Sequence, residues 1–349
     1  MNPWTEPRWR NGFDCEAGRR NDAHCSLVRR PNDVRRARFD GTATGGDSFT
    51  RSKTPGVRSL SLLAVLTVVV APAVARAFPL LYLPDSVAGA RSIAMGDAFR
   101  GVASSNDAII DNPAGLALNP HYEIAGFFAW DTAAPAAYWN GSVVDATTLP
   151  LAVGVSYSHI GSGNDILGNM APGRYVGSSY RLALAYPVSD VLAVGVNADW
   201  LRYGGDVNGG NGIDAVTGGA ALALKLGDMF TIGAVGSNLV DVGTSLVPRQ
   251  FAVGASFGTD STFRVDVDGV ATIEQSAAYD LHVGGEYFLA QLLALRGGYF
   301  YSGLTQQHFV SGGVGLVVPG FAIEGAYRQS VAPWVDHLFV VDLKFFLDG

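Results

Sequence analysis

Large apolar residues alternate with Gly, Ala, Ser or charged residues along most of the chain beyond position 120. In 151–158, Leu, Val, Val and Tyr fall on one face, and Ala, Gly, Ser and Ser on the other. The same alternation recurs in 179–186, 251–257 and 321–328. Successive side chains of a strand point to opposite faces, so a period of two residues predicts β-strands.

The pattern predicts about fourteen strands, joined by connections that are alternately short and long. Tight turns at one end and longer loops at the other are typical of bacterial outer-membrane barrels, and an even strand count puts both chain ends on the periplasmic side. The expected strands are 122–130, 136–145, 149–158, 176–186, 191–201, 214–226, 229–237, 249–257, 261–268, 278–288, 291–301, 306–317, 321–328 and 337–346.

The composition of the two strand faces separates a membrane barrel from a soluble β-sandwich. The less apolar face consists mostly of Gly, Ala and Ser, and only 16% of the chain is charged. Such a face is a poor solvent surface, but it can line a barrel lumen. We therefore expect an all-β protein, a transmembrane antiparallel β-barrel of about 14 strands. Aromatic residues near the strand ends, among them Phe127, Phe128 and Trp200, are expected to form interfacial girdles.

The first 77 residues differ from the rest. Residues 1–56 show no apolar period and are expected to be a disordered or wrongly assigned N-terminal extension. Residues 57–77 contain an apolar stretch from Leu60 to Val70, followed by Ala75-Arg76-Ala77, which predicts a secretory signal peptide cleaved after Ala77. An apolar stretch of this length is too short for a transmembrane helix, which needs roughly 20 residues.

The remaining chain, 78–349, is acidic and contains no cysteine. It holds 11 Lys and Arg against 24 Asp and Glu, because both cysteines, Cys15 and Cys25, lie in the extension. An acidic chain has no electrostatic footprint for nucleic acid, and without cysteine there is neither a disulfide nor a thiolate metal site.

Residues 85–118 lack strand alternation and carry the most specific resemblance. The sequence ARSIAMGDAF, followed by SSNDAIIDNPAGLAL and an aromatic strand, resembles the N-terminal signature of the FadL-like superfamily, with the PorV/PorQ-type branch the best fit. The resemblance implies a fourteen-stranded barrel, 121–349, with an N-terminal hatch, 78–120, folded into its lumen. It also implies that Asn112-Pro113-Ala114 is the family's NPA turn.

The residues of that turn have a physical interpretation of their own. Asn112 can bond nearby backbone, Pro113 fixes its φ angle, and Gly115 is expected to free the next bend, which together give a rigid corner. The alternative is an ordinary tight turn without a transport role. The longest loop, 159–175, has 17 residues, much shorter than the capture loops of fatty-acid transporters, so capture of long-chain fatty acids is disfavoured.

Ionisable residues of both signs occupy the inward face of the C-terminal strands. They are expected either to gate a pore and anchor the hatch, or simply to fill the lumen with a ladder of ion pairs. The set comprises Arg264, Asp266, Asp268, Asp280, His282, Glu286, Arg296, Glu324 and Arg328, together with Asp342 and Lys344.

No catalytic constellation is recognisable, and no enzyme activity is expected. The histidines of 78–349 are scattered singly. Asp206, Asn208, Asn211 and Asp214 could hold calcium, but their spacing does not match an EF-hand and favours a plain Gly/Asn turn. The sequence therefore predicts no metal and no cofactor.

Two functions remain open for such a barrel in the outer membrane of a Gram-negative bacterium, with outer-membrane lipid as its surroundings. The first is passive uptake or binding of small hydrophobic compounds, with the hatch or a gap in the wall controlling passage. The alternative is a PorV-type scaffold that docks secreted or surface proteins.

Overall fold

The computed structural model describes residues 87–101, 103–132, 136–162, 175–205, 210–259, 261–273, 278–331 and 336–347. The expected extension 1–56, the expected signal peptide 57–77 with its cleavage site at Ala77, and hatch residues 78–86 lie outside these ranges. Asp206 and Asn208 of the possible calcium loop lie outside them as well.

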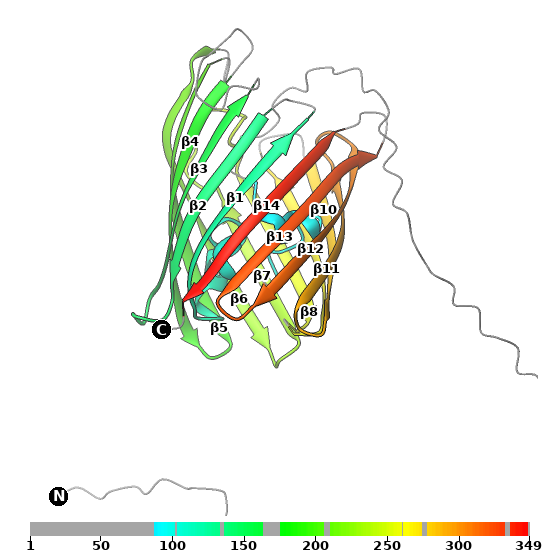
Figure 1. Cartoon of the computed structure of the whole chain (residues 1–349). Helices are drawn as coiled ribbons and strands as arrows, with labels where there is room; N and C mark the ends of the chain where they lie inside the picture. Colours follow the sequence, from blue (N-terminus) through cyan, green and yellow to red (C-terminus); the bar gives the residue numbers. More distant parts are fainter. Residues whose placement is uncertain are drawn as a thin grey trace, which may run out of the picture. The chain divides into compact units, whose positions relative to one another are not determined.

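The described residues form a closed barrel of fourteen antiparallel strands, so the predicted fold class is confirmed (Figure 1). Every strand pairs with its neighbours in sequence, and β14 closes the wall against β1, where Tyr122 lies opposite Leu347. The strands are β1 (Tyr122–Asp131), β2 (Ala136–Asp145), β3 (Ala152–Ser162), β4 (Tyr175–Ser189), β5 (Leu192–Gly205), β6 (Ile213–Leu226), β7 (Phe230–Ser237), β8 (Gln250–Gly258), β9 (Phe263–Thr272), β10 (Ala278–Leu289), β11 (Leu293–Ser302), β12 (Gln307–Val318), β13 (Phe321–Val331) and β14 (His337–Leu347).

The alternation seen in the sequence separates the two surfaces of the wall. Large apolar side chains such as Val216 and Val253, each 60% exposed, point outward. Small ones such as Ala183 and Ala193, both 0% exposed, point into the lumen. Among the described residues, no helix is long and apolar enough to cross a membrane.

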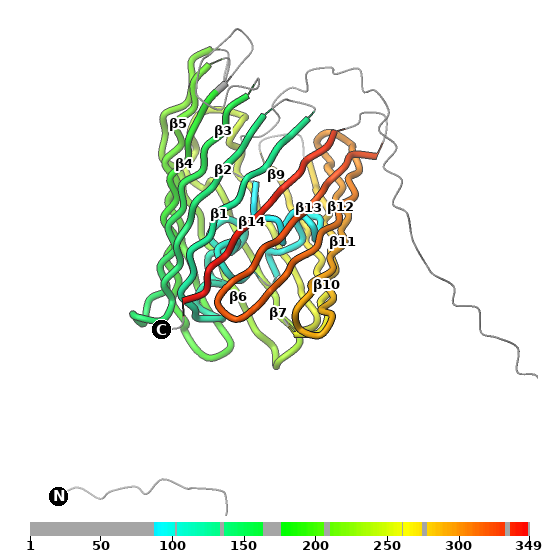
Figure 2. Tube along the Cα trace, viewed as in Figure 1, coloured from blue at the N-terminus to red at the C-terminus, as the bar shows by residue number. Residues whose placement is uncertain are grey.

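The chain before β1 lies inside the barrel, where Figure 2 shows it enclosed by the wall. It contains the short helices α1 (Ala90–Ala94), η2 (Ser105–Asp107), α2 (Ala108–Asp111) and η3 (Pro113–Ala117). We call its described residues, 87–101 and 103–120, the hatch. Because these helices are too short to be stable alone, their position depends on packing against the inner wall.

The connection between β7 and β8 folds back over the lumen. Its neck is closed by a hydrogen bond from Asn238 Nδ2 to the Pro248 carbonyl, 3.1 Å. Val247 of this connection, 6% exposed, packs in a cluster with Leu201 and Tyr203 of β5. The connection thus covers part of one barrel end.

The predicted strands coincide with the observed ones to within about three residues at most boundaries. One expectation about the aromatic residues is wrong. Phe127 faces the lumen and packs on Ile93 of the hatch, whereas Trp139, Tyr157, Tyr180 and Trp200 form a row of ring contacts across β2–β5 on the outer surface.

Candidate functional site

The NPA turn lies at the centre of the hatch and ties three segments together. Asn112, 1% exposed, caps η3 by accepting a hydrogen bond from Ala114 N at 3.1 Å. Its Nδ2 donates to the Arg100 carbonyl at 2.8 Å and to the Leu222 carbonyl of β6 at 3.3 Å. Asn112 therefore joins η3 to the preceding hatch turn and to the barrel wall.

Pro113 and Gly115 fit this corner for different reasons. Pro113 is the first residue of η3, where its missing N–H is not needed. Gly115 does not act by freeing the backbone, as the sequence suggested. A Cβ at this position would overlap the Ala103 carbonyl, so Gly115 allows two parts of the hatch to approach closely.

A network of buried ion pairs fastens the hatch to β10–β14. It begins at Arg91 of α1, whose Nη2 lies 2.6 Å from Glu286 Oε1. Glu286 is shared with Arg296 at 2.6 Å, and Arg296 reaches Glu324, also at 2.6 Å. Buried charges are costly unless paired, so removing one member of this ion-pair network would leave a partner with an uncompensated charge.

The ion-pair network returns to the hatch through β14. Lys344 Nζ lies 3.2 Å from Glu324, 3.5 Å from Asp342 and 2.9 Å from Asp107, which belongs to η2. Each of these side chains is at most 4% exposed. One lysine thus balances three carboxylates, and the ion-pair network both starts and ends on the hatch.

A second group of contacts holds the turn after α1. Asp268 of β9 accepts hydrogen bonds from the backbone N–H groups of Phe99 and Arg100, at 2.9 and 2.8 Å. Arg328 of β13 pairs with Asp97 at 2.8 Å. His282 of β10 lies 2.9 Å from the Gly96 carbonyl through its Nδ1.

The predicted lumen residues therefore play unequal parts. The hatch is contacted directly by Asp268, His282, Glu286 and Arg328. Arg296 and Glu324 are linked to it through their ion pairs with Glu286 and Lys344. Asp280 instead accepts a hydrogen bond from Gly303 N, at 2.8 Å, in the β11–β12 turn. Arg264 and Asp266 are buried on β9.

Sequence reasoning missed the hatch partners Arg91, Asp97, Arg100 and Asp107. It also missed the ion pair between Arg181 and Asp199 on β4 and β5. This last pair could have been found, because the two residues lie directly opposite each other in the β4–β5 register.

Burial changes the acidity of the hatch itself. It raises the pKa of Asp111 to about 7, and the charges of Asp107 and Asp97 act in the same direction. Arg100 opposes this effect. Burial tends to lower the pKa of Arg100, but the surrounding carboxylates, Asp268 first, outweigh it and hold that pKa above its ordinary value.

The wall opposite the charged strands presents small apolar residues to the hatch. Met95, Phe99, Ile109 and Leu116, each at most 1% exposed, pack in one cluster with wall alanines. Those alanines are Ala152, Ala183, Ala185, Ala193, Ala221, Ala223 and Ala252.

Inward-facing glycines also surround the hatch. At each of them a Cβ would come within 3.0 Å of hatch atoms, most of them backbone, so the absence of a side chain brings wall and hatch into direct contact. We call this set the glycine belt. It consists of Gly154, Gly195, Gly233, Gly254, Gly284, Gly298 and Gly313.

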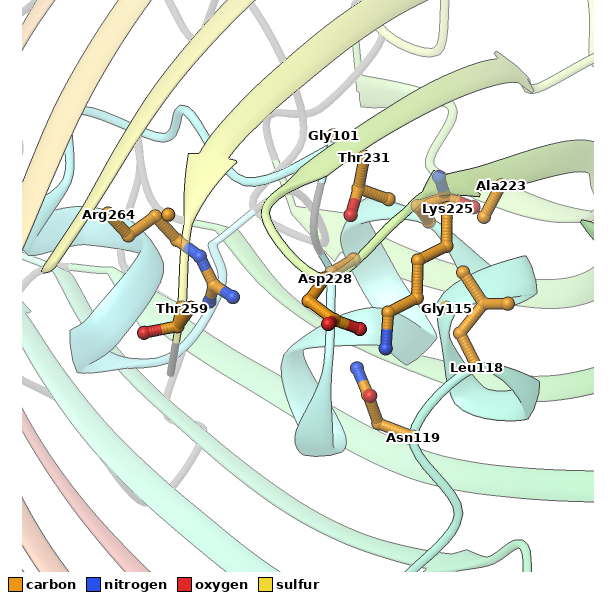
Figure 3. Close-up of a pocket in the computed structure, with 13 residues that line it drawn as sticks. Gly101, Gly115, Leu118, Asn119, Ala223, Lys225, Asp228, Thr231, Thr259 and Arg264 are labelled. Atoms are coloured by element: carbon orange, nitrogen blue, oxygen red, sulfur yellow. The ribbon is translucent and has the colours of Figure 1, made fainter. Parts of the chain in front are cut away.

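Two cavities lie on opposite sides of the hatch. The turn-side cavity, about 90 Å³, is lined by residues near the short turns, including Asp228 and Thr259. Figure 3 shows Asp228, Lys225 and Asn119 gathered on one side of it, with Arg264 and Thr259 on the other.

The loop-side cavity, about 240 Å³, lies between the hatch and the β7–β8 connection. Arg100 and Pro113 border it, whereas their neighbours Gly101 and Asn112 border the turn-side cavity. The two cavities are thus separated by two adjacent stretches of hatch, which we call the partition, and these are joined by the Asn112–Arg100 hydrogen bond.

No protein-family model matches the sequence, and no curated protein matches it. Solved structures do match in fold. The chain is similar to the CymD monoaromatic hydrocarbon channel, with a TM-score of 0.60 at 14% identity over 78% of this chain and 100% of that one.

It is also similar to the Ralstonia pickettii toluene transporter TbuX, with a TM-score of 0.56 at 16% identity over 78% of this chain and 100% of the other. A Pseudomonas aeruginosa FadL homologue matches with a TM-score of 0.58 at 12% identity, over 76% of this chain and 99% of the other. At these identities the likeness establishes a shared fold, and the fold is the one that the FadL-like resemblance implied.

Proposed function

We propose that this chain is an outer-membrane barrel that binds small hydrophobic compounds and lets them pass without an energy source. The observation that carries the proposal is the pair of cavities on either side of the hatch, separated only by the partition. Structures of the same fold include a monoaromatic hydrocarbon channel and a toluene transporter, which supports this class of compound.

The outer surface supports a membrane location. Exposed apolar side chains such as Leu182, Leu222 and Val253 cover it, and a surface of this kind is stable only in an apolar medium. We place the short turns on the periplasmic side. Tyr122 and Leu347 pair at that end of the barrel, so both ends of the barrel domain would then face the periplasm, which agrees with the signal peptide that we propose at 57–77.

We propose that the hatch, and not a gap in the wall, controls passage. The ladders β2–β3 and β3–β4 run without a break in register. The β6–β7 ladder covers only 220–226 of β6. In the part of β6 before residue 220, the β7–β8 connection bonds to the wall, with Leu239 N 2.7 Å from the Gly218 carbonyl. A compound in the lumen therefore meets the partition first.

The test is a flux assay with the full chain, purified from membranes and reconstituted into vesicles whose outer leaflet contains lipopolysaccharide. Toluene and a small sugar are the probes. We expect the wild type to speed toluene entry, and Asn112→Ala to raise entry of both probes, because it removes the hydrogen bonds that close the partition.

Asn140→Ala is the matched control. Asn140 is also buried and inward-facing, but its Nδ2 bonds Ser158 of the neighbouring strand, at 2.8 Å, so this variant is expected to behave like the wild type. A barrel that admits neither probe, in the wild type or in Asn112→Ala, would falsify the proposal. The docking-platform alternative has no observation in its favour among the described residues.

A further inference from the structure

We infer that the loop-side cavity is a binding site for a small, neutral aromatic compound that carries a hydroxyl group, of the phenol class. This inference rests on the proposed function and names the ligand class of the same lumen. It is carried by the shape, the charge balance and the hydrogen-bonding groups of the cavity.

The cavity is lined by both apolar and polar groups. The hatch, through Ile110 and Pro113, forms its floor, and Val247 of the β7–β8 connection covers it. Val235 and Val270 of the wall continue the apolar surface. Charged groups and the rings of His282 and Phe300 also line it, and Asp280 lies next to Val270 in the β9–β10 pairing. A ligand that fills the space needs one apolar portion and one polar group.

The charges leave no site for an anion. Every arginine that the structure describes at this cavity already faces a carboxylate. The pairs are Arg100 with Asp268, Arg328 with Asp97 and Arg181 with Asp199. Asp111 and Asp280 also border the cavity, so a carboxylate ligand would meet more acidic groups and no unpaired cation. A fatty acid is therefore disfavoured and a neutral ligand is favoured.

His282 supplies a hydrogen-bond acceptor. Its Nδ1 lies 2.9 Å from the Gly96 carbonyl, and because a carbonyl only accepts, this nitrogen carries the proton. Nε2 of the neutral ring is then an acceptor, and it is buried with no hydrogen-bond partner among the described residues. A hydrocarbon would leave it unsatisfied, whereas a hydroxyl can donate to it once the side chains around the ring shift to admit the ligand.

Flat groups stack on this side of the lumen. The His282 and Phe300 rings are 4.5 Å apart and tilted by only 9°, and Phe300 and Phe309 are 5.1 Å apart at 15°. Arg328 lies over the Phe309 ring, 5.5 Å from its centre. A planar ligand extends such a stack with favourable ring contacts.

The volume limits the size of the ligand. A protein cavity of about 150 Å³ is known to hold benzene, so about 240 Å³ accommodates a ring with one or two small substituents. A long-chain fatty acid, with roughly three times as many heavy atoms as benzene, exceeds this space by the same scaling.

The test is a binding measurement on the full chain, purified from membranes in detergent, with p-cresol, toluene, 4-methylbenzoate and palmitate as probes. We expect p-cresol to bind about tenfold more tightly than the other three, a difference that one satisfied hydrogen bond supplies. His282→Leu should reduce p-cresol affinity to that of toluene and leave toluene affinity unchanged. His282→Gln keeps an acceptor and should retain part of the preference.

His308→Leu is the control, because His308 is exposed and bonds the Tyr299 hydroxyl at 2.6 Å. The inference is overturned if p-cresol does not bind, if toluene, 4-methylbenzoate or palmitate binds as tightly, or if His282→Leu keeps the preference. In those cases the vesicle assay tests the proposed function separately. Toluene entry through the barrel would support the proposed function without the phenol-class ligand, and absence of entry would contradict both.

Discussion

The two halves of the lumen wall hold the same hatch by different means. Strands β9–β14 contribute Asp268, Glu286 and Lys344, which bind hatch groups through ion pairs and charge-assisted hydrogen bonds. Strands β3–β8 contribute alanines, against which Ile109 and Leu116 pack, whereas the glycine belt runs through both halves.

The difference indicates which side of the hatch can move. Ion pairs among buried groups are directional, and breaking one leaves a charge exposed to an apolar interior. Packing on small residues is weaker per residue and has no fixed direction. The turn-side cavity is bordered by β6–β9, so we expect the hatch to leave the small-residue half first while its charged contacts persist.

The largest effect is expected where the charged half is broken. Lys344→Met leaves Asp107, Glu324 and Asp342 without their common cation, which should cost about 3–5 kcal/mol of stability. Hydrogen exchange of hatch amides and thermal unfolding of the barrel measure it. Lys225→Met is the control, because Lys225 lies on β6 at the turn-side cavity and makes no ion pair there among the described residues. Equal effects of both substitutions would remove the distinction between the two halves.

The next effect concerns Asp111 of α2, which contacts β3 and β4 of the small-residue half. Its pKa is raised to about 7 in the folded chain from 3.8. The folded state therefore disfavours the charged form, so hatch docking weakens as pH rises from about 4 to about 7 and stays weakened above. The total change in the free energy of hatch docking over this pH range is at most about 4 kcal/mol.

Hydrogen exchange of the hatch at pH 5 and pH 8, corrected for intrinsic rates, measures this dependence. In Asp111→Asn the cost of charging is gone, so the difference between the two pH values should shrink. An unchanged difference in this variant would assign the pH dependence to other groups.

The smallest effect is expected at the glycine belt. In Gly233→Ala the new Cβ would overlap the Arg100 carbonyl and lie 2.6 Å from Asn112 Nδ2, so the hatch must shift, at a cost of about 1–3 kcal/mol. Ion conductance of the reconstituted barrel should rise. Gly269→Ala, where nothing lies within 4 Å of the added Cβ, should leave conductance unchanged. If both variants conduct alike, close packing at the belt does not seal the lumen.

Much of the fold follows from local pattern. Period two assigns each strand residue to one face, and the alternation of short and long connections orders the strands into one meander. This is why the inward residues from Arg264 to Arg328 could be named without a structure. Phe127 was misplaced because aromatic residues suit a strand on either face.

The partners within the lumen could not be predicted in the same way. Which hatch residue faces which strand depends on the tilt and stagger of the barrel, and neither leaves a trace in the spacing of Asp107 or Arg91. The role of Gly115 was misjudged for a similar reason, since a glycine needed for close approach looks the same in sequence as one needed for a bend.

The ion pair between Asp107 and Lys344 also has a consequence for the order of assembly. Its partners are 237 positions apart, and Lys344 lies on the strand that closes the wall against β1. Contacts of such sequence separation form late, because much of the chain must be arranged before they exist. This contact of the hatch can therefore form only when β14 is in place, so the closing of the last seam and the locking of the lumen become one kinetic step.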